Sequence, residues 1–209
     1  DSKEAHLLNK QIFACIYYAS VEKSVENAIE HRKLLLDIKY NTGCSIRYED
    51  SIEYKILREE LELSDKYIGS YSTFEGSPMS LGKFQFDLWG VKPLEKAGDL
   101  VFNWEGLRNQ IMTHGVRNSL LVAPMPTAST SQINGSNECF EPFTNNIYTR
   151  RTMAGSFVII NKYLVADLIE LGIWTPELKD KIILADGSIQ NIDEIPLTIK
   201  NMYRTVWEM

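Results

Sequence analysis

Residues 118–132 constrain the fold of this 209-residue chain most, because three local signals follow one another there. The apolar run at residues 120–123 has the length and aliphatic content of a buried strand. Pro124 and Pro126 then end any strand ladder, since proline has no backbone N–H to donate. The next residues are small or hydroxylated and are suited to begin a helix. They are Thr127, Ala128, Ser129, Thr130 and Ser131.

A helix begins with backbone N–H groups that have no partner inside the helix, and its first turn carries a partial positive charge. Both properties favour the binding of a phosphate group. The loop has no lysine and the chain has no GxxxxGK[ST] pattern, which excludes the common nucleoside-triphosphate P-loop. From the residues alone two interpretations stay open, a phosphate-binding loop or a polar connection between a strand and a helix.

The composition is that of an ordinary folded domain, with 44% hydrophobic and 24% charged residues. A net charge of −6 argues against a nucleic-acid-binding protein, which would carry a basic surface. No apolar run reaches the roughly 20 residues of a membrane-spanning helix, and the N-terminal residues do not form a signal peptide. Three widely spaced cysteines match neither a disulfide framework nor a zinc site. We therefore expect a cytoplasmic protein without a metal site in this segment.

Helical patterns dominate the rest of the chain. Residues 5–31 and 104–114 predict two helices, and the second ends at Gly115. Asn161 and Thr175 predict the starts of two more, and a last helix follows Pro196 and continues to the end of the chain. The apolar face expected for the first helix is Leu8, Ile12, Cys15, Ile16 and Ala19. The face expected for the last helix is Ile199, Met202, Tyr203 and Val206.

Extended segments are expected at residues 82–89, 147–150 and 156–160, with turns at 74–78, 153–155 and 185–188. Trp89 and Trp104 are expected in the core. Arg150 and Arg151 are adjacent, so a strand would point them to opposite faces and at most one could face a phosphate. We expect each arginine at the surface or in an ion pair.

Residues 32–68 are strongly charged. A turn at 41–43 and a helix from about residue 50 to 63 predict a helical hairpin on the surface. Its charges are expected to face solvent, and contact with a partner is the alternative. The thin apolar stripe of its second helix would be Ile52, Ile56, Leu57 and Leu61.

Several longer motifs resemble the large, catalytic subunit of class I ribonucleoside-diphosphate reductase. They are RNSLLVAPMPTASTSQI at 117–133 and NECFEPFTNNIYTRR at 137–151, with FEGSP at 74–78, FDLW at 86–89, GSIQ at 187–190 and YRTVWE at 203–208. The resemblance implies an α/β fold, namely part of a ten-stranded α/β barrel. It makes residues 1–209 a fragment of that catalytic barrel domain and residues 32–68 a lineage-specific helical insertion, because many relatives lack this stretch.

The resemblance also implies a function. Thr127, Ala128, Ser129 and Thr130 match the family's loop for the substrate diphosphate. The complete enzyme would reduce ribonucleoside diphosphates to 2′-deoxyribonucleoside diphosphates by thiyl-radical chemistry. It would work as a homodimer or higher oligomer with a small radical-generating subunit that carries a di-metal centre, with thioredoxin or glutaredoxin as dithiol reductant, and with ATP and deoxynucleoside triphosphates as effectors. None of these cofactors is expected on this segment, which would be inactive alone.

The family's radical chemistry uses an Asn-x-Cys-x-Glu motif, and this chain contains that spacing in Asn137, Cys139 and Glu141. Two features argue against a catalytic role. The flanking residues resemble a later family segment in which the cysteine position also accepts serine, and the radical cysteine lies well before the phosphate loop in chain order. We expect Cys139 to be structural and no catalytic residue in this fragment.

Two alternatives to an enzyme segment remain. One is a nucleotide- or phosphate-binding domain without redox chemistry, and the other is an assembly domain that uses the charged insertion. Binding of a nucleoside diphosphate would distinguish these two, and formation of deoxynucleotides would distinguish the enzyme from both.

Overall fold

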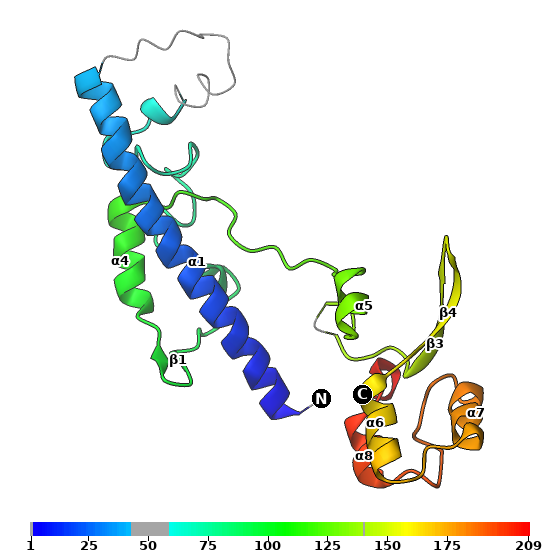
Figure 1. Ribbon diagram of the computed structural model, residues 1–209. Helices are drawn as coiled ribbons and strands as arrows, with labels where there is room; N and C mark the ends of the chain where they lie inside the picture. The colour runs from blue at the N-terminus through cyan, green and yellow to red at the C-terminus, as the bar shows by residue number, and fades with distance from the viewer. Residues whose placement is uncertain (1, 43–58, 140) are drawn as a thin grey trace. The chain divides into compact units, whose positions relative to one another are not determined.

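The computed structural model describes residues 2–42, 59–139 and 141–209 (Figure 1). They divide into two compact units, Asp1–Ala123 and Pro124–Met209. The boundary falls at the first proline of the stretch that the sequence singled out.

The first unit is built on helix α1 (Lys3–Asp37), which continues into a π-helical turn, η1 (Ile38–Thr42). The Ser2 hydroxyl caps its start by accepting a hydrogen bond from the Ala5 N–H at 3.1 Å. The helix predicted at 5–31 is therefore confirmed and is longer than expected. Its predicted apolar face is wrong at Leu8, Ile12 and Ile16, which are exposed, whereas Cys15 is half-buried and packs on the first core. The buried positions lie further along and are Val21, Ser24, Val25, Ala28 and Leu35.

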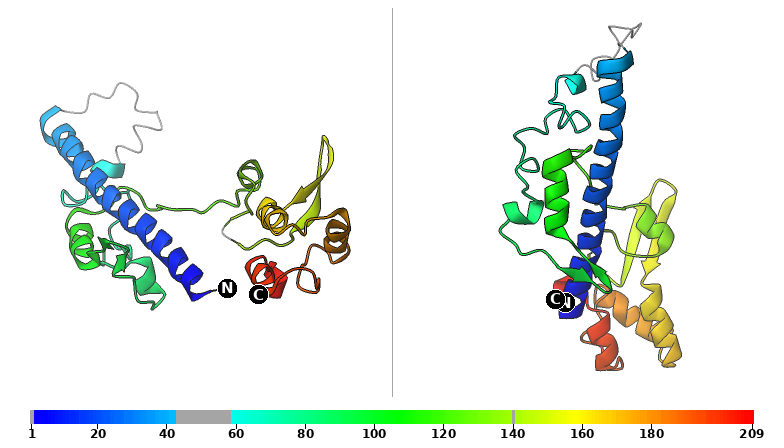
Figure 2. Two further views of the ribbon diagram at one scale, coloured as in Figure 1. Left: turned by 60° about the horizontal axis from the view of Figure 1, so that its bottom comes forward. Right: turned by 90° about the vertical axis from the view of Figure 1, so that its left-hand side faces the viewer.

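Helix α4 (Trp104–His114) packs beside α1 (Figure 2). The Asn103 side chain accepts a hydrogen bond from the Gly106 N–H at 2.9 Å, and the helix ends as predicted at Gly115, whose φ of 79° suits glycine. The Trp104 indole is buried, as expected, and its N–H donates to the Leu94 carbonyl at 2.7 Å. Five described aromatic rings lie 5.0–6.1 Å from it, namely Tyr17, Tyr18, Phe84, Phe86 and Phe102.

Residues 82–89 do not form the extended segment expected of them. They contain a short helix, α3 (Gln85–Leu88), because the Asp87 carboxylate accepts the Phe84 N–H at 2.8 Å and so caps a helical turn. Trp89 follows this turn and is 71% exposed, so its predicted core position is wrong. Two short strands, β1 (Lys96–Ala97) and β2 (Leu100–Val101), pair as an antiparallel hairpin.

The predicted hairpin at 32–68 is described only at its two ends. Most of its second helix, with Ile52, Ile56 and Leu57, lies outside the described residues; residues 59–61 are helical and Leu61 is half-buried. Glu60 departs from the expectation of solvated charges, because it is only 5% exposed.

Glu60 joins two other parts of the first unit. One carboxylate oxygen lies 3.0 Å from His31 Nε2 on α1, and the other lies 2.8 Å from an Arg117 guanidinium nitrogen. The neighbouring backbone is held as well, since the Arg117 N–H donates to the Ser24 carbonyl and the Asn118 N–H to the Ser24 hydroxyl, both at 3.0 Å. These contacts fix Arg117 and Asn118, which directly precede the segment that leads to the loop.

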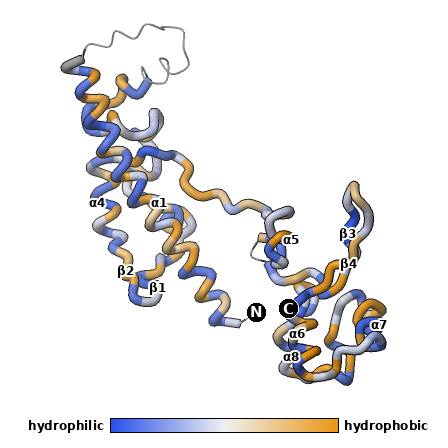
Figure 3. Tube along the Cα trace, in the orientation of Figure 1, coloured by the Kyte–Doolittle hydropathy of each residue, from blue (hydrophilic) through white to orange (hydrophobic). Residues whose placement is uncertain are grey.

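Residues 120–123 follow this anchor but do not form the predicted buried strand. They pair with no strand among the described residues, and Leu120 is 90% exposed, whereas Leu121 packs on the first core. A β-strand needs a neighbour to complete its ladder. Figure 3 shows this segment as an apolar stretch of the tube.

The second unit contains an antiparallel hairpin of β3 (Ile147–Thr152) and β4 (Gly155–Ile160), which confirms the predicted pair of extended segments. Helices α6 (Lys162–Glu170) and α7 (Pro176–Leu184) begin at the predicted caps, with Asn161 and Thr175 accepting backbone hydrogen bonds. The core of this unit contains Ile147, Leu164, Leu168, Leu178, Ile182, Ile189, Ile192 and Ile195.

The last helix, α8 (Leu197–Met202), is shorter than predicted. It ends before Tyr203, and a 3-10 turn, η2 (Val206–Glu208), follows. The Thr205 N–H donates instead to the Glu208 carboxylate at 2.7 Å, and the Val206 N–H to the Phe143 carbonyl at 2.9 Å. These contacts turn the chain away from the helical path that the spacing of apolar residues suggested.

The buried Asn146 side chain connects the parts of this unit. Its amide N–H groups donate to the carbonyls of Gly187 and Tyr203, both at 3.1 Å, and its oxygen accepts from the Asn161 amide at 3.0 Å. The Asn161 N–H also donates to the Asn146 backbone carbonyl at 2.8 Å. The start of β3 is thereby fixed to α6 and to two later turns.

The contacts of Glu60 generate a test. Glu60→Gln should leave the Arg117 guanidinium without its carboxylate and weaken the local fold by about 2 kcal/mol. Removing one partner of a fully buried pair costs about 3–5 kcal/mol, and the 32% exposure of the Arg117 side chain reduces that cost. Hydrogen exchange of the Arg117 and Asn118 amides should then accelerate about 30-fold, since 1.36 kcal/mol corresponds to a factor of ten. Glu59→Gln, at an exposed position, is the matched control; equal exchange in both variants would contradict the prediction.

A second test concerns Tyr203, whose hydroxyl donates to the Asp167 carboxylate at 2.6 Å. Burial and this carboxylate raise the pKa of Tyr203 to about 12. Tyr203→Phe should lower the free energy of unfolding by about 1 kcal/mol, the typical contribution of one hydrogen bond. Because the folded pKa is the higher one, the difference between wild type and variant should be constant below about pH 10, the pKa of an unfolded tyrosine, and shrink above it. Thermal unfolding of both proteins from pH 8 to 11 measures this difference in stability. A difference that grows above pH 10 would contradict the hydrogen bond from Tyr203 to Asp167.

Candidate functional site

The candidate loop leads into helix α5 (Thr130–Asn134), which begins where the sequence predicted a helix. Ser129 is the N-cap residue, although its side chain caps no N–H, and Gly135 ends the helix in the left-handed conformation with φ 66°. Ala128, Ser129 and Thr130 are exposed and Thr127 is half-buried. All four predicted phosphate-loop residues therefore lie together at the start of α5.

Two residues of the loop hold a backbone conformation that is uncommon outside glycine. Thr127 has φ 56° and Cys139 has φ 55°. Each conformation costs roughly 1–2 kcal/mol for a residue with a Cβ atom, and such residues persist where the surroundings fix them. Here they fix each other, because the Cys139 N–H donates to the Thr127 hydroxyl at 2.9 Å and to the Pro126 carbonyl at 3.2 Å. The Thr127 hydroxyl in turn donates to the Pro126 carbonyl at 2.7 Å.

The backbone N–H groups at the start of α5 differ in whether they have a hydrogen-bond acceptor. The Ser131 N–H donates to the Thr127 carbonyl at 2.9 Å. The N–H groups of Ala128, Ser129 and Thr130 donate no hydrogen bond to any other described residue. Three consecutive N–H groups on an exposed loop can donate hydrogen bonds to an anion, which is one of the two interpretations that the residues left open.

Strand β3 and helix α6 brace α5 from the side. The Tyr148 hydroxyl lies 3.3 Å from the Gln132 amide nitrogen, an Arg150 guanidinium nitrogen donates to the Ala128 carbonyl at 3.3 Å, and the Lys162 ammonium donates to the Asn134 carbonyl at 3.1 Å. The sequence did not predict these supports. The alternation of a strand could have indicated two of them, because residues 148 and 150 share one face of β3.

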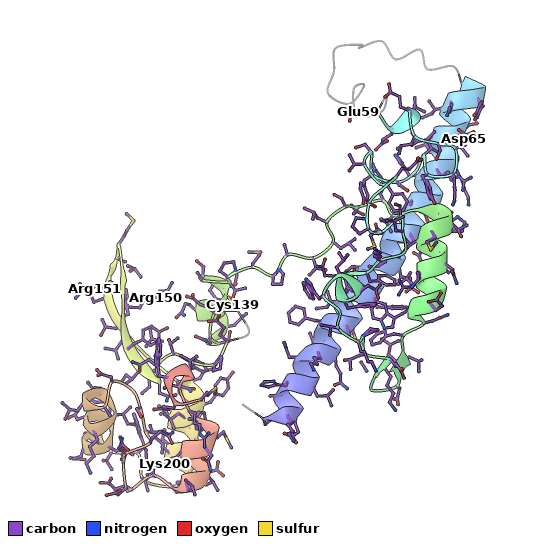
Figure 4. The ribbon with its side chains drawn as sticks, turned by 180° about the vertical axis from the view of Figure 1, so that it is seen from behind. Glu59, Asp65, Cys139, Arg150, Arg151 and Lys200 are labelled. Carbon is purple, nitrogen blue, oxygen red and sulfur yellow. The ribbon has the colours of Figure 1, made fainter. Side chains whose placement is uncertain are left out.

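Figure 4 shows Arg150 and Arg151 on the hairpin, in the same unit as Cys139. Arg150 also lies 3.9 Å from the Glu138 carboxylate, which confirms the expectation of an ion pair for that arginine. Arg151 is exposed, as expected of a surface residue.

The Asn-x-Cys-x-Glu spacing is used for loop structure. The Asn137 amide donates to the backbone carbonyls of Glu141 at 3.0 Å and Pro142 at 2.7 Å. The exposed Cys139 thiol lies 3.4 Å from the Pro126 carbonyl. Asn137 and Cys139 therefore both contribute to the conformation of the loop. This agrees with a structural role for Cys139, and that role stays a prediction.

Ser131, which the sequence analysis did not place in the phosphate loop, has a buried hydroxyl oxygen that bonds to no described residue. Within the described ranges there is no cluster of three or more His, Cys, Asp or Glu side chains that could hold a metal ion. No helix in the described part of the chain is long and apolar enough to cross a membrane.

A strained, hydroxyl-rich loop that opens a short helix and is supported by a β-hairpin is a candidate anion site. Comparison with known proteins specifies the family. The family model described as "Ribonucleotide reductase, barrel domain" matches residues 1–209. The chain therefore belongs to the ribonucleotide reductase barrel-domain family.

Named relatives agree with this assignment. The chain is 47% identical over 208 residues to "Ribonucleoside-diphosphate reductase large subunit" of Caenorhabditis elegans, which covers all of this chain and 21% of that protein. It is 45% identical over 209 residues to the Arabidopsis thaliana large subunit, covering all of the chain and 20% of the relative. A mimivirus large subunit is 53% identical over 160 residues, or 77% of the chain and 18% of the relative. The chain thus spans about a fifth of the length of these relatives.

The contacts of Cys139 generate a test for any reductase that contains this chain. Cys139→Ser should keep the backbone hydrogen bonds at this position and leave turnover within about threefold, because the thiol makes only one weak contact. The matched control is Cys15→Ser, at a position on α1 outside the loop. Turnover reduced to the background rate by Cys139→Ser alone would show that Cys139 is catalytic.

Proposed function

We propose that this chain is a segment of the large subunit of a ribonucleoside-diphosphate reductase and that it binds the substrate diphosphate at residues 127–130. The observation that carries the proposal is the set of three consecutive N–H groups, at Ala128, Ser129 and Thr130, that bond to no other described residue at the start of α5. The family assignment supplies the substrate class, since the relatives named above are ribonucleoside-diphosphate reductases.

The loop residues divide into two kinds on this proposal. The Thr127 hydroxyl is engaged inside the loop, where it holds the left-handed turn together with Cys139, so its contribution is the shape of the loop. The Ser129 and Thr130 side chains are exposed, and the Thr130 hydroxyl makes only a long 3.5 Å contact with the Thr127 carbonyl. These two hydroxyls are free to turn toward a phosphate oxygen.

Such a loop acts by positioning. Neutral amide and hydroxyl donors hold the diphosphate, and the ribose is thereby placed at a fixed distance from the reacting groups, which lowers the entropic part of the barrier. In the complete enzyme a thiyl radical would act on that ribose, with a small radical-generating subunit, a dithiol reductant such as thioredoxin or glutaredoxin, and nucleoside-triphosphate effectors as partners. Subunit association as a homodimer or higher oligomer is part of the same proposal.

The alternative of a phosphate-binding segment without redox chemistry applies to these 209 residues when they are isolated. The proposed reaction needs a radical cysteine and a redox-active pair, whereas the sequence has three cysteines, at positions 15, 44 and 139, far apart in the chain. We expect deoxynucleotide formation to be absent from the isolated segment.

A bulky side chain in the loop tests the proposal. Ser129→Leu in the complete subunit should weaken binding of ribonucleoside diphosphates about 10- to 100-fold, because it fills the space above the three N–H groups and costs about 1.4–2.8 kcal/mol of binding energy. Equilibrium dialysis with ADP, CDP, GDP and UDP at saturating effector measures the affinity. Asn134→Leu, at the exposed far end of α5, is the matched control, and equal affinity in the two variants would sink the assignment.

A further inference from the structure

Among the described residues, Arg150 is the charged side chain that contacts the backbone of the proposed phosphate loop. It comes from β3, where Tyr148, two residues earlier on the same face, contacts Gln132 of α5. Its guanidinium donates to the Ala128 carbonyl at 3.3 Å. One face of the hairpin therefore supports both the loop and the helix that follows it.

The contact with the Ala128 carbonyl also sets the direction of the next N–H group. A peptide unit is planar and trans, so the carbonyl of Ala128 and the N–H of Ser129 point in opposite directions. When Arg150 holds the carbonyl on the hairpin side, the Ser129 N–H is turned away from the hairpin. A guanidinium donor strengthens this bond relative to a neutral one because the donor is charged.

The ion pair with Glu138 explains the position of the Arg150 side chain less well than the hydrogen bond to Ala128 does. The two charged groups are 3.9 Å apart, and their side chains are 33% and 46% exposed. Ion pairs of this kind between solvent-exposed groups contribute little to stability. The bond to the loop carbonyl is the shorter contact.

We infer that Arg150 is a positioning residue for the substrate diphosphate. It fixes the peptide between Ala128 and Ser129 so that the Ser129 N–H faces the phosphate, and its positive charge beside the loop favours a dianionic group. This inference rests on the proposed function of the loop and adds a residue from β3 to it.

The experiment compares Arg150→Met with Arg151→Met in the complete subunit. Arg151 is the adjacent arginine on the opposite face of β3 and is exposed, so the two variants remove the same charge from the same strand. Dissociation constants for ADP, CDP, GDP and UDP are measured by equilibrium dialysis, inorganic pyrophosphate is used as a competitor, and KM and kcat are measured in the assembled enzyme.

Arg150→Met should raise the dissociation constant about tenfold for the four nucleotides and for pyrophosphate, with kcat at saturating substrate nearly unchanged. Arg151→Met and Glu138→Gln should bind like the wild type. Arg150→Lys, which keeps a charged donor at the carbonyl, should recover most of the affinity. A loss confined to kcat, or a lysine variant as weak as the methionine variant, would overturn the inference.

Ser129→Leu separates this inference from the function on which it rests. If Ser129→Leu weakens binding but Arg150→Met binds like Arg151→Met, the loop binds the diphosphate and Arg150 does not position it. If Ser129→Leu has no effect either, the proposed function of the loop fails. An Arg150→Met protein that does not fold is replaced by Arg150→Gln, for which the same tenfold difference from Arg151→Gln is expected.

Discussion

The side-chain amide of Asn146 is the interaction on which the second unit depends. It is buried, and its two N–H groups and its oxygen bond to three segments that are distant in sequence, at residues 161, 187 and 203. A buried amide that lost these partners would cost about 1–3 kcal/mol for each group left unsatisfied. Because Asn146 immediately precedes β3, the same amide fixes the strand that carries Tyr148 and Arg150 toward the loop.

In the proposed function, the loop binds an anion through neutral groups and without a lysine. Its shape comes from two left-handed residues, Thr127 and Cys139, that bond to each other, and its donors are backbone N–H groups. The positively charged Arg150 side chain contacts the loop at the Ala128 carbonyl. Affinity in such a site depends on the direction of peptide units, so residues that hold those peptide units in place affect binding without touching the ligand.

Local features of the sequence predicted local structure well. The caps at Asn161 and Thr175 and the glycine end at Gly115 were correct because each depends on neighbours within four residues. The expectations that failed depend on distant partners. Residues 120–123 find no strand to pair with among the described residues, and Leu8 and Trp89 face outward because the core formed elsewhere along the chain.

In the candidate site, too, features set by neighbouring residues could be predicted and features set by distant residues could not. The start of α5 at Thr130 could be predicted from its hydroxylated residues, and the ion pair of Arg150 was among the expected possibilities. The bond from Arg150 to Ala128 and the bond between Cys139 and Thr127 could not be predicted, because they join residues 22 and 12 positions apart whose approach depends on the hairpin and on an unusual backbone conformation. The family barrel was identified from motifs, whereas the described residues pair only as two short antiparallel hairpins.

The mutual bond between Thr127 and Cys139 has a consequence for how this segment can vary during evolution. The two residues hold together the ends of the segment 127–139, which contains α5. The residues between them can therefore change in identity while the two ends of the segment stay in place. The pinned positions themselves are restricted by backbone conformation more than by side-chain chemistry, so asparagine or glycine should be accepted at 139 more readily than valine or isoleucine. The backbone conformation at position 139 therefore admits several residue types, of which cysteine is one.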